Sequence, residues 1–196
     1  MNTQNKNTLY PIFLKLNKLD LLIVGGGNVG LEKVSFILKN SPDAKITMIA
    51  TFFLDALREL VKDYNVTLIE RAFEDSDLKG RDIVVCATDN YDLHIHIVEL
   101  NKHTKTLTNV ADTPDLCDFY LGSIVSRGDL KIAISTNGKS PTLGKRIRQY
   151  LEDALPDNTQ QIINGLKAFR DTLKGDFESK VRALNDVTKK LSDRED

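Results

Sequence analysis

Residues 22 to 31 read LIVGGGNVGL, and their glycines have the spacing of a loop that binds a nucleotide. Gly25, Gly27 and Gly30 form G-x-G-x-x-G directly after an apolar run and at the beginning of a helix-like run, the context that a dinucleotide fingerprint requires. Gly25 permits a tight turn, Gly27 lets backbone N–H groups approach a pyrophosphate, and Gly30 permits close packing of helix on sheet. A strand-to-helix turn without a ligand is the alternative, and the placement favours the nucleotide.

The acidic residue that usually binds the ribose hydroxyls is missing from this fingerprint. It would lie at the end of the second strand, near Ala50 or Thr51, where the chain reads IATFFLD. Asp55 lies too far into the next helix to replace it. We therefore expect backbone groups or Thr51 to hold the ribose, and charge does not decide between NAD and NADP.

A second cofactor contact is expected at ATDN, residues 87 to 90, where Thr88 and Asp89 follow the fourth strand. Sheets of this kind bind their ligand at the carboxyl ends of the strands. A polar turn that caps the next helix through Asp89 or Asn90 explains the same residues equally well.

The candidate for proton transfer is Asp112, in NVADTPDLCDF, which leaves the fifth strand at the same edge as the glycine loop. A carboxylate beside a cofactor can act as a general base or acid. From the pattern alone, an Asx-turn before Thr113 and Pro114 is the favoured alternative.

Residues 127 to 148 carry an excess of positive charge, because they contain six basic residues and a single acidic one, Asp129. The basic residues are Arg127, Lys131, Lys139, Lys145, Arg146 and Arg148. The loop at 135 to 140, STNGKS, adds small hydrogen-bond donors before a helix N-terminus. Six residues are expected to bind an anionic, polycarboxylate ligand: Thr136, Asn137, Lys139, Ser140, Lys145 and Arg146. A solvated helix face is the ordinary alternative.

Metal and thiol chemistry find little support. His94 and His96 are two residues apart, so on a helix they point in different directions and cannot share an ion. Cys86 and Cys117 lack the paired spacing of a zinc site and are expected to be small buried hydrophobes. We expect no dedicated metal site, so any metal handled here would be held by substrate and carboxylate.

Strand-like and helix-like segments that would position these residues alternate up to residue 110. Apolar runs predict strands at 19–25, 45–50, 66–70, 82–87 and 106–110. Apolar residues at helical spacing predict helices at 28–39, 53–62 and 92–101. Apolar strands with helices between them imply a doubly wound, Rossmann-type parallel sheet covered on both faces.

The pattern changes beyond residue 110. Residues 119–126 and 130–135 predict two strands joined by SRGD, an antiparallel addition. Pro141 fits the first turn of a helix that runs to about Leu155, before Pro156. A helical, amphipathic tail follows, broken at Gly175, with apolar residues at Ile163, Leu166, Phe169, Leu173, Phe177, Val181, Leu184, Val187 and Leu191.

The composition limits the class of protein. With 196 residues and 41% hydrophobic content, the chain can bury a core as one large domain or one domain with a smaller appendage. The polar N-terminus and the lack of a long apolar run lead us to expect a cytoplasmic protein without a membrane partner. A net charge of -1 argues against general nucleic-acid binding.

Several segments together resemble the siroheme synthase family. They are YPIFLKL at 10–16, VGGGNVGLEK at 24–33, ATDN at 87–90 and the long stretch NVADTPDLCDF through GKRIR at 109–148. More narrowly, they are similar to the precorrin-2 dehydrogenase and sirohydrochlorin ferrochelatase module, expected here without the methyltransferase domain. The match covers nearly the whole chain, and the long stretch is far more specific than the glycines.

The resemblance implies oxidation of precorrin-2 to sirohydrochlorin with NAD as hydride acceptor, and ferrous iron as a further substrate where members also insert it. It implies a homodimer, with a NAD-binding domain over 1–112, a small α+β dimerisation and substrate-binding region over 113–149 and a C-terminal helical domain over 150–196. The alternative is a regulatory module that senses NAD without catalysis.

The resemblance also implies roles for individual residues. Asp112 matches the family's central acid, and the family's cofactor contacts match Asn28, Val29, Thr51 and Phe52. Thr136 stands where the family commonly has a serine that is sometimes phosphorylated, so that modification is not expected to carry over directly. The tetrapyrrole substrate carries eight carboxylates, which gives the basic residues a ligand.

Overall fold

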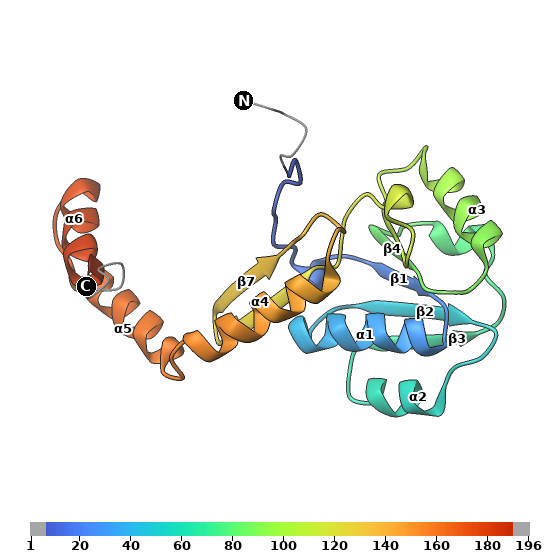
Figure 1. Ribbon diagram of the computed structural model, residues 1–196, viewed down its shortest axis with the longest axis horizontal. Helices are drawn as coiled ribbons and strands as arrows, with labels where there is room; N and C mark the ends of the chain where they lie inside the picture. Colours follow the sequence, from blue (N-terminus) through green and yellow to red (C-terminus); the bar gives the residue numbers. More distant parts are fainter. Residues whose placement is uncertain (1–6, 190–196) are drawn as a thin grey trace. The chain divides into compact units, whose positions relative to one another are not determined.

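The computed structural model describes residues 7 to 189, and Figure 1 shows its elements coloured along the chain. The chain divides into two compact units. The first unit runs to Ser123 and takes up Ser135–Gly144 again, while the second comprises Ile124–Ile134 and the chain from Lys145 onward. The domain boundaries expected after residues 112 and 149 stay predictions.

A five-stranded sheet forms the centre of the first unit, in the order β3-β2-β1-β4-β5. All four strand pairs are parallel. The strands are β1 Leu21–Val24, β2 Ile46–Ala50, β3 Val66–Glu70, β4 Ile83–Cys86 and β5 Leu107–Val110. The strand order reverses between β1 and β4, which is where doubly wound sheets bind ligands. The predicted Rossmann-type plan is therefore confirmed.

Helices lie on both faces of this sheet (Figure 1). α1 (Asn28–Asn40) and α2 (Asp55–Val61) cover one face, and α3 (Tyr91–Asn101) with the 3-10 turn η3 (Asp75–Leu78) covers the other. Ile23 and Met48 of the sheet are buried with Leu57 of α2, whereas Val84 is buried on the opposite face with Ile97 of α3. Because both faces are covered, the strands read as apolar runs in the sequence.

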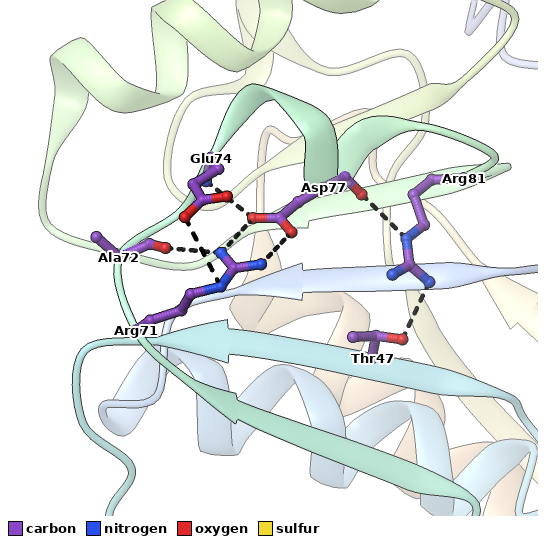
Figure 2. Close-up of polar contacts among 6 residues, drawn as sticks. All are labelled: Thr47, Arg71, Ala72, Glu74, Asp77 and Arg81. Carbon is purple, nitrogen blue, oxygen red and sulfur yellow. Dashed lines mark hydrogen bonds and ion pairs between the residues drawn. The ribbon is translucent and has the colours of Figure 1, made fainter.

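The connection from β3 to β4 is tied to the sheet by a polar network (Figure 2). The Arg71 guanidinium donates to both carboxylate oxygens of Asp77, at 2.8 and 2.6 Å, and the backbone N–H of Glu74 donates to the same carboxylate. Arg81 donates to the backbone carbonyl of Asp77 at 3.1 Å and to Thr47 of β2 at 3.0 Å. The hydrogen bonds from Arg71 lower the pKa of Asp77.

A hairpin and three helices follow the parallel sheet, and apart from Ser123 and Pro141–Gly144 they lie in the second unit. β6 (Ser123–Arg127) and β7 (Leu130–Ile134) form a two-stranded sheet of their own rather than extending the parallel sheet. The predicted helices are present as α4 (Pro141–Ala154), α5 (Thr159–Thr172) and α6 (Phe177–Thr188). Leu191, predicted to continue the last helix, lies outside the described residues. No helix within residues 7 to 189 is long and apolar enough to cross a membrane.

Candidate active site

The glycine turn between β1 and α1 is closed by backbone contacts that leave no room for side chains. Gly25 has a φ of +126°, and a Cβ there would lie 2.3 Å from the carbonyl oxygen of Ala87, just after β4. A Cβ at Gly30 would lie 2.3 Å from the carbonyl oxygen of Gly25. Glycine is therefore required at both positions, and the turn packs tightly between α1 and β4.

Gly27 is the glycine of the fingerprint that faces free space. The nearest atom to a Cβ placed there is Cζ of Phe52, at 3.9 Å. Phe52 follows β2 and is 56% exposed, and this contact places its ring beside the turn. A dinucleotide fits this arrangement, because the space lies where the fingerprint places the pyrophosphate.

The first turn of α1 offers unpaired donors at the same place. Gly27 is the N-cap residue and makes no side-chain cap, and the first turn contains no acidic residue. The first N–H groups of a helix have no partner within the helix, and here they include those of Asn28 and Val29. The helix field favours an anion there by about 0.3–1 kcal/mol. The predicted cofactor residues on α1 thus have the geometry for phosphate binding.

The predicted capping of α3 is confirmed for Asn90. Its side-chain oxygen accepts from the backbone N–H of Leu93 at 3.0 Å. Asp89 is exposed. Its assignment as a cofactor contact stays a prediction.

Thr88 is held in place by a buried histidine. Its hydroxyl is hydrogen-bonded to Nε2 of His94 at 2.8 Å and accepts from the backbone N–H of Asn90 at 3.2 Å. Burial lowers the pKa of His94, although the charge of Asp89 opposes this shift, so the imidazole is neutral near pH 7. The backbone nitrogen of Thr88 would lie 3.1 Å from a Cβ at Gly25. The structure thus brings Thr88 against the glycine turn, and its hydroxyl is engaged by His94 and Asn90.

Asp112 follows β5 in a strained and exposed conformation. Its φ of +58° lies in the left-handed region, which is uncommon for residues other than glycine but tolerated by Asp and Asn. An Asx-turn closed two residues on is impossible, because Pro114 has no N–H. Within residues 7 to 189, no hydrogen bond or ion pair engages the Asp112 carboxylate. The group is therefore free to exchange a proton with a bound molecule.

Cys117 closes the turn that carries Asp112 and packs, partly buried, against the core cluster on the α3 face of the sheet, so its prediction as a small buried hydrophobe is confirmed in part. The thiol is half-buried, and its sulfur accepts from the backbone N–H of Val110 at 3.2 Å and lies 3.2 Å from the Val110 carbonyl oxygen. Burial raises its pKa, so it stays a thiol near neutral pH. Its position among Asp, Thr and Pro residues, outside any apolar run, is the sequence signal for this role. Cys86 is fully buried in the same core cluster, as predicted, and burial raises its pKa to about 12.

The residues after Cys117 are bound along β5. The backbone N–H of Asp118 donates to the Thr108 carbonyl at 2.8 Å, and the Thr108 N–H donates back to the Asp118 carboxylate at 2.8 Å. The Asn109 side chain donates to the carbonyl of Phe119 at 2.8 Å. Both ends of the Asp112 turn are therefore fixed to the same strand.

The register of the sheet brings the three segments to one edge. Val24 of β1 lies level with Cys86 of β4, and Cys86 lies level with Val110 of β5. The glycine turn, Thr88 and Asp112 therefore leave three neighbouring strands at similar heights. Two strand spacings, about 10 Å, separate β1 from β5.

The loop from Ser135 to Gly144 belongs to the first unit, although the hairpin before it does not. The Thr136 hydroxyl donates to the Ser140 carbonyl and accepts from the Ser140 N–H, both at 3.1 Å. The Ser140 hydroxyl caps α4 by accepting from the N–H of Leu143 at 3.2 Å. Asn137 lies at a φ of +55°. The hydroxyls of Thr136 and Ser140 therefore shape the loop, and their predicted contact with substrate is not tested.

The basic residues fall into two groups. Three that were expected to bind substrate are exposed, namely Lys139, Lys145 and Arg146. Arg148 instead forms an ion pair with the Glu152 carboxylate at 2.6 Å, and Arg127 donates to the backbone carbonyl of Glu152 at 2.7 Å. Lys139 lies in the first unit, whereas Lys145 and Arg146 are counted with the second.

The two histidines of α3 have separate partners. His94 contacts Thr88, and His96 contacts Asp75 at 2.7 Å. Within the described part of the chain, no three His, Cys, Asp or Glu side chains are grouped to hold a metal ion.

Together, the parallel sheet, the glycine turn and the open first turn of α1 define a Rossmann-type NAD(P)-binding protein. Comparison with known proteins gives the same class. Residues 12–123 match the family model described as "Putative NAD(P)-binding", and residues 127–154 match the model described as "Sirohaem biosynthesis protein central".

Two curated relatives and one solved structure narrow the class. The siroheme synthase of Ruthia magnifica subsp. Calyptogena magnifica is 37% identical over 167 residues, covering 85% of this chain and 35% of the relative. The siroheme synthase of Pseudoalteromonas atlantica is 38% identical over 170 residues, covering 87% of this chain and 36% of the relative. A structure named "SirC, precorrin-2 dehydrogenase" is similar with a TM-score of 0.72 at 25% identity, covering 94% of this chain and 93% of that chain.

The chain belongs to the family described as "Putative NAD(P)-binding", and it is similar to siroheme synthases, as the sequence segments predicted. It spans about a third of the length of the curated relatives that it matches.

Proposed function

We propose that this chain oxidises precorrin-2 to sirohydrochlorin in siroheme biosynthesis, with NAD as cofactor. The observation that carries the proposal is the free Asp112 carboxylate, held in a left-handed turn two strand spacings from the glycine turn. The name of the similar solved structure, a precorrin-2 dehydrogenase, supports the reaction. The bound nicotinamide would supply the hydride acceptor.

In this proposal some residues bind the cofactor or the substrate, and Asp112 transfers the proton. Gly27 and the first turn of α1 would bind the pyrophosphate, and Thr51 and Phe52 would lie against the adenosine side. Asp112 would take the proton that leaves the substrate, with a general-base contribution of about 10²–10⁴-fold in rate. The exposed cations Lys139, Lys145 and Arg146 would pair with substrate carboxylates.

Insertion of ferrous iron into sirohydrochlorin is a second candidate activity. It requires a base for the two pyrrole protons that the metal displaces, and the unpaired Asp112 carboxylate suits that role. Iron mixed with sirohydrochlorin in the absence of NAD tests it. Siroheme should form faster than in a control without protein, and equal rates would remove this activity.

A homodimer in the cytoplasm completes the proposal. Apolar side chains on α4, including those of Leu143, Ile147 and Tyr150, are exposed and would be covered by a second copy. Both cysteines are free, in keeping with a reducing compartment. Analytical ultracentrifugation tests the dimer, and a monomer at micromolar concentration would contradict it.

Anaerobic incubation of the purified chain with precorrin-2 and NAD tests the dehydrogenase reaction. Sirohydrochlorin absorbance should appear with each NAD reduced. Absence of product would overturn the assignment, and NAD binding without turnover would favour the regulatory alternative.

The variant Asp112→Asn tests the proposed base. Asparagine tolerates the left-handed conformation, so the turn should persist while the base is lost. Turnover should fall by about 10²–10⁴-fold, and the NAD dissociation constant should change less than about twofold. Asp115→Asn, an exposed carboxylate in the following 3-10 turn η4 (Pro114–Leu116), is the matched control and should keep wild-type turnover. Near wild-type turnover in Asp112→Asn would remove Asp112 from the mechanism.

A further inference from the structure

An ion pair lies beyond the carboxyl ends of β2 and β3, near the expected position of the adenosine ribose. Arg58 of α2 donates to the carboxylate of Glu70, the last residue of β3. Glu70 lies level with Ala50, the last residue of β2, so their side chains point to the same face of the sheet. That face is the one covered by α1 and α2.

Contacts connect this pair to the glycine turn. A Cβ placed at Gly26 would lie 3.0 Å from Cβ of Ala50 and 2.7 Å from Cδ1 of Phe53. The Arg58 guanidinium carbon lies 5.5 Å from the centre of the Phe53 ring. The pair is therefore separated from the pyrophosphate loop by one aromatic side chain.

The neighbouring cations already have partners. Arg71 follows Glu70 but points to the opposite face, where it is bound to Asp77. Lys62 of the loop after α2 pairs with Glu59. Arg58 is thus the basic group best placed to meet a phosphate on the ribose, and Glu70 holds it.

We propose that Glu70 makes this chain prefer NAD to NADP. In Rossmann-type sites an acidic residue usually binds the 2′-hydroxyl of NAD, whereas an arginine accommodates the 2′-phosphate of NADP. Here the acid is absent from the end of β2 and is supplied from the adjacent strand. Glu70 neutralises Arg58, so the pair presents no net positive charge to a 2′-phosphate. This inference rests on the proposed use of a nicotinamide dinucleotide.

Calorimetric titration of the full chain with NAD and with NADP tests the inference. Wild type should bind NAD more tightly. Glu70→Gln, which keeps the side-chain shape but leaves the charge of Arg58 uncompensated, should raise the affinity for NADP relative to NAD about tenfold. Adding Arg58→Met should return the ratio of NADP affinity to NAD affinity toward the wild-type value. Glu59→Gln makes the same charge change on α2 and is the matched control, which should keep the wild-type ratio.

The outcomes separate this inference from the function on which it rests. An unchanged ratio in Glu70→Gln overturns it, as does a gain in NADP affinity that survives the loss of Arg58. Tighter NADP binding by wild type overturns it too, while NAD(P) binding itself stands. If wild type binds neither dinucleotide, the proposed cofactor fails and the inference fails with it. Circular dichroism of each variant separates a change in binding from a loss of fold.

Discussion

The two units of the molecule differ in how far they bury their apolar residues. In the first unit, buried residues from Leu21 to Val110 form two clusters, one on each face of the sheet. Among the described residues of the second unit, Val125 is the single buried hydrophobic. Its helices α5 and α6 expose Phe169, Phe177 and Val187 instead.

This difference indicates that the two units are stabilised by different means. The first unit has enough buried apolar surface to fix the glycine turn and Asp112 on a rigid sheet edge. The second unit depends on polar contacts such as those of Gln160 with Asp129 and of Arg127 with Glu152. Its amphipathic helices present an apolar face without a core of their own, which the proposed homodimer would cover.

Matched truncations of apolar side chains give the largest expected contrast. Leu57 of α2 is fully buried, so Leu57→Ala should lower the free energy of unfolding by about 2–5 kcal/mol, because it removes contacts and leaves a cavity. Phe177 of α6 is 81% exposed, so Phe177→Ala should change the free energy of unfolding by less than about 0.5 kcal/mol in dilute solution. Urea unfolding followed by circular dichroism measures both. Equal losses would erase the difference between the units.

Asp77 is expected to show the next largest effect, and a dependence on pH. Asp77→Asn weakens two hydrogen bonds from Arg71 and one from Glu74, and should cost about 1–3 kcal/mol at pH 7. The folded state lowers the pKa of Asp77, so this stabilisation is complete above the unfolded pKa of about 3.9. It is lost as the pH falls through the lower folded value.

Thermal unfolding of wild type and Asp77→Asn between pH 7 and pH 2 measures this dependence. The difference in melting temperature should shrink below about pH 4. Asp63→Asn, an exposed carboxylate after α2, is the control and should follow wild type. A difference that stays constant down to pH 2 would show that the Arg71–Asp77 pair does not supply the stabilisation.

The sheet could be predicted from the sequence because burial on both faces leaves apolar runs. Leu21–Val24 and Ile83–Cys86 are fully buried, and each was recognised as a strand. The return of Ser135–Gly144 to the first unit could not be predicted. It depends on contacts between distant segments and on the ring of hydrogen bonds between Thr136 and Ser140, which no periodicity reveals.

The candidate site was predictable where the backbone demands one residue type. Gly25 is an example, since its φ of +126° and its contact with Ala87 exclude any side chain. The hydrogen bonds of Cys117 with Val110 were missed, because a cysteine in the sequence suggests burial but does not reveal hydrogen-bond partners. The Arg58–Glu70 pair was missed because it depends on the register of β2 and β3, which only the folded sheet defines.

Gln160 of α5 offers the smallest expected effect and the finest test of how the second unit is held. Its side chain accepts from the backbone N–H of Asp129 at 2.7 Å and donates to the Asp129 carboxylate at 2.9 Å. The side chain lies against Gly128, where a Cβ would be 1.9 Å from its oxygen. Gln160→Ala should cost about 0.5–1.5 kcal/mol locally, because both bonds are partly exposed.

Hydrogen exchange resolves this local effect. In Gln160→Ala the Asp129 amide should exchange about tenfold faster, because it loses its acceptor, while amides of β1 keep their protection. Gln161→Ala, at an exposed neighbouring position of α5, is the control and should exchange like wild type. Unchanged exchange at Asp129 would mean that the hairpin does not depend on this contact. Faster exchange in β1 as well would mean that the two units unfold together. The difference in apolar burial between the units would then not make them differ in stability.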